Sequence, residues 1–228
     1  SWVREQMGVG APEPALVVVI DTGVDGAVLQ GPLASVFAPN SAEMLSADEW
    51  HTTLGDTSCV DADRNGFPRD VFGAAAALGR PCNPTQVYPK LAPGLQSDYW
   101  PDHGGYVAGL VAGGPAFLAL GHAQRYISLR AYRTITEDNN GTVYTQEHEV
   151  ALATQYALAI DANIINFSGA TPDTDACPVG NRILIVAAAG NNSELLGDAF
   201  ESSHFPANAD NHPSNLLVVG AYRLQEGE

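Results

Sequence analysis

A single histidine precedes a run of small residues in the segment Asp102-His103-Gly104-Gly105-Tyr106-Val107-Ala108-Gly109-Leu110-Val111-Ala112-Gly113. Glycine lowers helix stability relative to alanine, so several glycines in one helix need a packing reason. A helix with so little bulk can press closely against a sheet, and this packing would hold the histidine rigidly. The ring could then face a cleft and act as a general base. A core histidine whose hydrogen bonds are satisfied is the alternative interpretation.

Short apolar runs lie on both sides of this segment and alternate with a helical pattern. The helical pattern covers residues 146–160, with Val150, Ala153 and Ala157 at helical spacing. The runs cover residues 16–20, 126–132, 164–167, 183–189 and 216–221. Strands that alternate with helices form βαβ units. We therefore expect an α/β fold with a mainly parallel central sheet and helices on both faces.

Residues 40–100 carry many Pro, Gly, Asp and Ser residues and show no sustained hydrophobic period. This composition indicates an insertion of loops and short elements rather than a second domain. With 228 residues, the chain is long enough to form one large α/β domain, which we expect to cover residues 1–228.

The chain is strongly acidic, with 26 Asp and Glu against 10 Lys and Arg and a formal net charge of −16. Such a surface repels phosphate backbones and anionic membranes, which argues against a nucleic-acid partner. No apolar run reaches the ~18 residues of a membrane span. The charge suits basic partners or bound cations, or it keeps the surface soluble.

The first residue and the cysteines bear on the compartment. The chain opens at Ser1 without a signal peptide, so we expect a mature or trimmed product. Cys59 and Cys82 could form a disulfide in an oxidising compartment, which predicts an extracellular or periplasmic location. Three unpaired thiols, including Cys177, are the alternative.

Polar residues follow the apolar runs. Asp21 comes directly after the first run, and Asn191 comes shortly after the run 183–189. Sites in open α/β sheets form beyond the carboxyl ends of the strands, so Asp21, His103 and Asn191 are expected at one rim. An aspartate can orient a histidine, a histidine can take a proton from a nucleophile, and an asparagine amide can stabilise an oxyanion.

The loop-rich interval also contains a candidate metal site. Its alternating acids, followed by Gly66, resemble the front half of a calcium loop, although the glutamate expected at the twelfth position is absent. Structural Ca²⁺ is the favoured interpretation, and a turn rich in Asp, Asn and Gly is the alternative. The predicted ligands are Asp61, Asp63, Asn65 and Asp70.

Six segments together resemble the motifs of the subtilisin-like serine proteases (subtilases), in the same order and with similar spacing. They are the aspartate motif at residues 18–25, the histidine motif at 103–109, the substrate-binding strand at 164–169, the segment ending in the oxyanion asparagine at 187–191, and the segments 205–207 and 218–221 that follow it. The stretch 61–73 also resembles an insertion in calcium-dependent members of that family. The resemblance covers most of residues 15–222.

The resemblance implies a role for each matching residue. Asp21 would hold His103 in the correct tautomer, His103 would be general base and then general acid, and Asn191 would donate to the oxyanion. Peptide or protein substrates would bind to the backbone of one segment, which is Ser168, Gly169 and Ala170. A second segment would line the pocket for a substrate side chain, and it consists of Ala188, Ala189 and Gly190.

Two departures from the family pattern stand out. Gly105 replaces a small hydroxyl residue, and no Gly-Thr-Ser-Met-Ala-like segment with the nucleophile occurs. We therefore expect the C-terminal part of the fold to be missing from this chain, which alone would be inactive. A complementary C-terminal chain that carries the serine would cover the apolar face left open. A truncated sequence and a peptide-binding pseudoprotease are the alternatives.

Two other classes of function remain. Asp21-Thr22-Gly23 is also an aspartic-protease signature, but such enzymes need two copies in a β-rich fold, and this chain has one copy in an α/β pattern. A structural calcium-binding protein is the remaining alternative.

Overall fold

The computed structural model describes residues 13–24, 32–44, 61–68, 70–75, 103–114, 118, 127–137, 143–145, 147–169, 182–190 and 213–220. Five of the residues singled out above lie outside this part of the chain, as does the segment 205–207. These residues are Ala170, Asn191, Cys59, Cys82 and Cys177.

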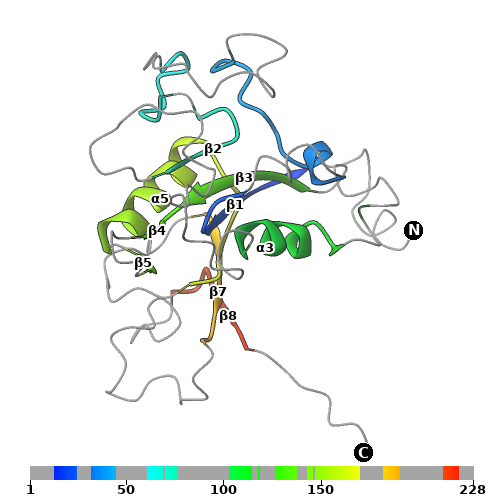
Figure 1. The fold of residues 1–228 in the computed structure, drawn as a ribbon, viewed down its shortest axis with the longest axis vertical. Helices are drawn as coiled ribbons and strands as arrows, with labels where there is room; N and C mark the ends of the chain where they lie inside the picture. Colours follow the sequence, from blue (N-terminus) through cyan, green and yellow to red (C-terminus); the bar gives the residue numbers. More distant parts are fainter. Residues whose placement is uncertain are drawn as a thin grey trace, which may run out of the picture.

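The core is a six-stranded sheet with the strand order β2-β3-β1-β6-β7-β8 (Figure 1). Every pair of neighbouring strands in it is parallel. The strands are β1 (Ala15–Asp21), β2 (Gly73–Ala75), β3 (Ile127–Arg133), β6 (Ile164–Phe167), β7 (Leu184–Ala188) and β8 (Leu216–Val219). The five apolar runs of the sequence are strands of this sheet, and the α/β prediction is confirmed.

Within the described residues, the remaining elements are two α-helices, a short 3-10 helix and a small hairpin-like pair of strands. They are η2 (Pro32–Ser35), α3 (His103–Val111), β4 (Ile135–Glu137), β5 (Val143–Thr145) and α5 (Glu147–Ala159). The strands β4 and β5 pair antiparallel in a sheet of their own, which the sequence patterns did not predict. Neither described helix is long and apolar enough to span a membrane.

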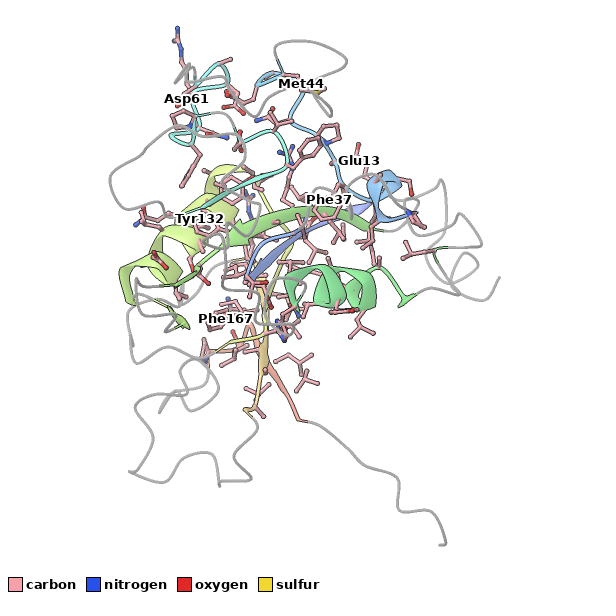
Figure 2. The ribbon with its side chains drawn as sticks, in the orientation of Figure 1. Glu13, Phe37, Met44, Asp61, Tyr132 and Phe167 are labelled. Carbon is pink, nitrogen blue, oxygen red and sulfur yellow. The ribbon has the colours of Figure 1, made fainter. Side chains whose placement is uncertain are left out.

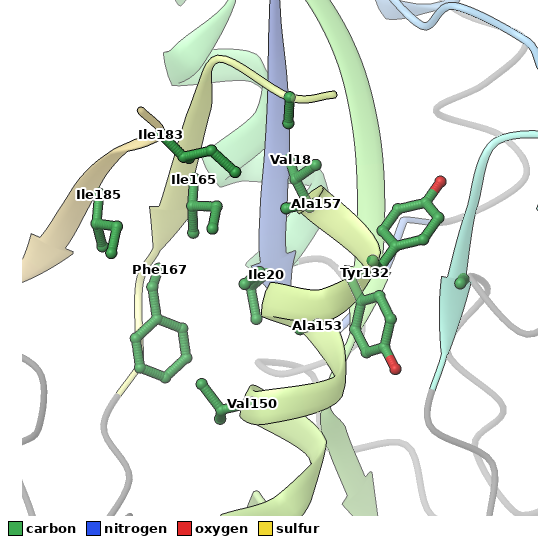
Figure 3. Packing of buried hydrophobic residues seen from close by; sticks show 13 residues of the cluster. Val18, Ile20, Tyr132, Val150, Ala153, Ala157, Ile165, Phe167, Ile183 and Ile185 are labelled. Atoms are coloured by element: carbon green, nitrogen blue, oxygen red, sulfur yellow. The ribbon is translucent and has the colours of Figure 1, made fainter. Parts of the chain in front are cut away.

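Alternation along β1 divides the core into two layers, because successive side chains of a strand point to opposite faces. Val18 and Ile20 join the cluster that contains α5, whereas Val17 and Val19 join the cluster that contains α3. Figure 1 shows the two helices on opposite sides of β1. Figure 3 shows the α5 layer, in which Val150, Ala153 and Ala157 of the helix face β1 and β6.

The described parts of the loop-rich interval pack onto this same sheet. Val71 and Phe72 are buried in the α3 layer. The Phe72 carbonyl accepts a hydrogen bond from the Ala131 amide at 3.1 Å, and β2 follows directly and extends the sheet beside β3. The interval 40–100 thus contributes the strand β2 to the sheet, which its composition did not predict.

The small residues of α3 serve a close approach to β1. Gly104, Gly105, Ala108 and Ala112 are buried, whereas Gly113 is exposed after the helix end. A Cβ atom on Gly104 would lie 2.0 Å from the carbonyl oxygen of Gly23, which is far inside van der Waals contact. The start of α3 therefore touches the backbone that follows β1, as only a glycine allows.

We predict opposite effects for two glycine substitutions in α3. Gly104→Ala should lower the free energy of unfolding by about 1–3 kcal/mol, because the added methyl group forces the helix away from Gly23. Gly109→Ala should be neutral or raise it by up to about 1 kcal/mol, because its Cβ would meet Leu33 Cδ1 at an ordinary 3.8 Å. Urea unfolding of both variants measures the difference. Equal stability of the two would contradict the close approach.

Candidate active site

The site begins with the pair Asp21 and His103, which come from different elements. Asp21 is the last residue of β1 and His103 is the first residue of α3. Because Val17 and Val19 face α3, strand alternation turns Asp21 to that same face. His103 Nδ1 lies 2.7 Å from Asp21 Oδ1, a short charge-assisted hydrogen bond.

Burial differs sharply between the two partners. The side chain of Asp21 is 1% exposed, whereas the imidazole of His103 is 39% exposed. The carboxylate is thus hidden behind a ring that reaches the surface. A ring held on one side and open on the other has the access that proton exchange with a bound molecule requires.

The hydrogen bond to Asp21 raises the pKa of His103 above its ordinary value of 6.5, and partial burial opposes this shift. Since the pKa is higher in the folded protein, the pair stabilises the fold below about pH 6.5. This contribution is lost as the pH rises through the raised pKa. The neutral ring, which a general base requires, is the majority form above that pKa.

The carboxyl ends of β6 and β7 lie at the same rim as Asp21. In the register of the sheet, Ile20 pairs with Phe167, and Phe167 pairs with Ala187. Ser168 and Gly169 follow β6, and β7 ends at Ala188, with Ala189 and Gly190 directly after it. All of them are at least partly exposed. The predicted substrate-binding residues that the structure describes thus gather beside the Asp21–His103 pair.

Hydrogen bonds already engage some of these groups. The Ser168 hydroxyl donates to Asn166 Oδ1 at 3.1 Å, and the Ala189 amide donates to the Val219 carbonyl at 2.9 Å. The Ala189 amide is therefore part of the sheet and is not free to bind a peptide.

A cluster of acids lies in the loop-rich interval, where Figure 2 shows Asp61 in the same region as Met44 and away from Phe167. Carboxylate oxygens of Glu43, Asp63 and Asp70 all lie within 4.8 Å of one another. Glu43 and Asp70 are buried and Asp63 is exposed. The cluster therefore concentrates negative charge at a partly buried position.

Two amides connect the cluster. Asn40 Nδ2 donates to Asp63 Oδ2 at 2.8 Å and to Asp70 Oδ1 at 2.7 Å. Asn65 Nδ2 donates to the same two carboxylates at 3.2 and 3.1 Å. Asp61 instead accepts hydrogen bonds from the backbone amides of Asn65 and Gly66, so its carboxylate shapes the turn.

Sequence reasoning missed Glu43 and Asn40. Both precede the acidic segment by about twenty residues, and neither stands in a motif. Glu43 Oε1 accepts hydrogen bonds from the backbone amides of Ala62 and Asp63, which brings the two loop segments together. Only this tertiary contact identifies Glu43 as a member of the cluster.

Burial raises the pKa of Asp70 to about 6, against the opposing effects of Asn40, Arg130 and Asn65. The Arg130 guanidinium donates to the carbonyl oxygens of Asp70 and Val71, at 2.8 and 3.1 Å. Ionised Asp70 is thus costly in this position, and a bound cation would offset that cost.

A mainly parallel sheet that places a buried aspartate against a half-exposed histidine at its carboxyl edge is typical of α/β hydrolytic enzymes. A family model described as the subtilase family matches residues 14–227. The chain therefore belongs to the subtilase family, and its general function is that of a serine peptidase acting on peptides or proteins. The chain has no match among the curated proteins that were compared.

We predict that Asp21→Asn lowers the pKa of His103 to 6.5 or below, because the hydrogen bond and charge that raise it are lost while partial burial remains. The ring proton signals of His103, followed by NMR across pH, report this pKa. Asp161→Asn is the control, because Asp161 is an exposed acid paired with Arg182. An unchanged pKa in Asp21→Asn would contradict the coupling.

Proposed function

We propose that the protein is an endopeptidase that hydrolyses peptide bonds by an Asp-His-Ser mechanism, with a serine supplied by a segment outside these 228 residues. The observation that carries the proposal is the 2.7 Å hydrogen bond between buried Asp21 and half-exposed His103 at the carboxyl edge of the sheet. Family membership independently supports a serine peptidase.

The geometry suits proton transfer by His103. When Nδ1 donates its proton to Asp21, Nε2 is the basic nitrogen of the neutral ring. Nε2 would take the proton of the serine hydroxyl as that oxygen attacks the scissile carbonyl carbon. The resulting imidazolium would be stabilised by Asp21 and would then protonate the leaving amine.

The rim residues would bind the substrate around this pair. An extended peptide would lie beside Ser168, Gly169 and Ala170 as an added strand. Ala188, Ala189 and Gly190 would line the pocket for the residue before the cut. The side-chain amide of Asn191 would donate a hydrogen bond to the tetrahedral oxyanion.

The serine-bearing segment needs a binding surface near His103, and exposed apolar residues of α3 lie there. Tyr106 and Leu110 follow His103 at helical spacings of three and seven residues, on the same side of α3, and are 70% and 74% exposed. Leu184 of β7 and Leu217 and Val219 of β8 lie on the α3 face of the sheet and are also exposed. We call these five residues the docking face.

A complementary chain that carries the serine is the partner we assign to the docking face. Two of its residues, Tyr106 and Leu110, lie on the side of α3 that presents His103, so a segment bound there could bring a hydroxyl to the ring. Exposed apolar patches of this kind typically mark an interface.

A peptide-binding protein without catalysis is the second candidate. The observation that favours it is the partly exposed rim of Ser168, Gly169 and Gly190, which could bind a peptide without a nucleophile. The aspartic-protease alternative is inconsistent with the parallel sheet and with membership of the subtilase family.

We further propose that the acid cluster binds structural Ca²⁺. Glu43, Asp63 and Asp70 offer carboxylate oxygens. The side-chain amides of Asn40 and Asn65 direct Nδ2 toward these carboxylates and would offer an oxygen to the cation after turning over. Calcium prefers such hard oxygen ligands in flexible arrangements. The raised pKa of Asp70 fits this donor set, because a cation would offset the cost of its buried charge. Asp61 would support the turn.

Material purified from its natural source tests the protease proposal. Intact mass should reveal a second polypeptide, the preparation should cleave casein, and a serine-directed phosphonate should label a serine outside these 228 residues. His103→Ala should reduce cleavage about 10²–10⁴-fold, because the general base is lost. A folded complex that neither cleaves casein nor reacts with the phosphonate would establish the peptide-binding alternative.

A matched pair of variants extends this experiment to the docking face. Leu217→Glu should reduce recovery of the serine-bearing polypeptide, because it places a charge on that face. Leu158→Glu changes a similarly exposed leucine on α5, across the sheet, and should leave recovery unchanged. Equal recovery of the serine-bearing polypeptide with the two variants would contradict binding at the docking face. A chain that stays folded and monomeric by itself would contradict the prediction that a partner must bury this face.

Calcium should stabilise the protein through the acid cluster. At a free Ca²⁺ concentration 100-fold above Kd, the free energy of unfolding should rise by about 2.7 kcal/mol. Thermal unfolding with Ca²⁺ or with EGTA measures the gain. Asp63→Asn should abolish most of it, whereas Asp161→Asn should retain it. A melting temperature that does not respond to Ca²⁺ would exclude the site.

A further inference from the structure

Three consecutive residues at the end of β1 contact the first two residues of α3. The Asp21 carboxylate accepts from the His103 ring, the Thr22 hydroxyl accepts from the Gly104 amide at 2.9 Å, and the Gly23 carbonyl lies against the Cα of Gly104. The middle contact joins residues 82 positions apart. The strand end and the helix start therefore meet in a defined register.

The Thr22 hydroxyl caps the N-terminus of α3. The first amides of an α-helix have no partner within the helix, and a side-chain oxygen close in sequence usually accepts from one of them. Here the acceptor of the Gly104 amide comes from another element, and Thr22 is buried with 4% exposure. Loss of this acceptor would leave a buried amide unsatisfied.

A second contact of Thr22 concerns the aspartate itself. The backbone amide of Thr22 donates to Asp21 Oδ1 at 2.7 Å, and this is the oxygen that His103 also contacts. One residue thus orients the carboxylate through its backbone and the helix start through its side chain. Both partners of the Asp21–His103 hydrogen bond are fixed relative to Thr22.

We infer that Thr22 is a positioning residue, whose hydroxyl fixes the start of α3 so that the His103 ring stays in hydrogen-bond contact with Asp21. The inference rests on the proposed function for its catalytic meaning, but the geometry that it concerns is independent of cleavage. Thr22 would act through Asp21 and His103 and would not touch the reacting atoms.

Thr22→Val isolates the hydroxyl, because valine is nearly isosteric and keeps the backbone amide that donates to Asp21. The pKa of His103, measured by NMR, should fall toward 6.5 in this variant. Exchange of the Gly104 amide with solvent should become about tenfold faster. Thr22→Ser retains the hydroxyl and should restore both values.

Thr134→Val is the matched control. Thr134 is fully buried at the end of the neighbouring strand β3, and its amide donates to the Asp21 carbonyl at 3.0 Å. Its hydroxyl has no hydrogen-bond partner in the described part of the chain. This variant should therefore leave the pKa of His103 and the exchange of Gly104 unchanged.

Three outcomes would overturn the inference. The first is a Thr22→Val variant that melts at a lower temperature but retains the raised His103 pKa, since that result reduces Thr22 to a structural role. The second is an equal pKa change in Thr134→Val. The third concerns the unmodified chain, in which a rapidly exchanging Gly104 amide would contradict the cap even if Thr22→Val fails to fold. None of these readouts depends on peptide cleavage, so a failure of the proposed function would be recognised separately.

Discussion

The contact between the end of β1 and the start of α3 is the constraint on which the rest of the site depends. Gly104 lies so close to the Gly23 carbonyl that no Cβ fits between them. This approach brings the first residue of the helix within hydrogen-bond reach of the last residue of the strand. A larger side chain at Gly104 would separate the acid from the imidazole, however well each element folded by itself.

The parallel sheet determines at which of its edges the site lies. β1 lies between β3 and β6, and all three run parallel, so their carboxyl ends meet at one rim. Because α3 covers the face to which Asp21 points, the carboxylate is buried while the ring beyond it stays accessible. The low exposure of Asp21 strengthens its interaction with His103, since water cannot screen the pair fully.

The acid cluster lies outside the central sheet, but its neighbouring residues contact the sheet and the helix that packs on it. Arg130 of β3 holds the carbonyl groups of Asp70 and Val71, and β2 begins shortly afterwards. Phe67, at the end of the acidic turn, packs edge-on against Tyr156 of α5, with 5.0 Å between ring centroids. Loop, strand and helix therefore share one buried contact region, through which the acidic turn is anchored to the sheet.

The sequence by itself determined five of the six strands of the central sheet, the two described α-helices and the family. Continuous apolar runs and helical spacing are local signals, and six motif segments in a fixed order are specific when taken together. It also singled out Asp21 and His103, because polar residues at strand and helix ends of an α/β fold point to one rim. The strand β2 escaped notice, because three residues that begin with glycine carry no period and gain their pairing only from β3.

Only the tertiary structure decided which groups meet and at what distance. Glu43 joins Asp63 and Asp70 through backbone amides of a separate loop segment, and Thr22 caps a helix that begins 81 residues later in the chain. Contacts of this kind leave no mark on local composition. They arise because packing brings distant segments together, and the hydrogen bonds and steric limits that fix the site exist only after that packing.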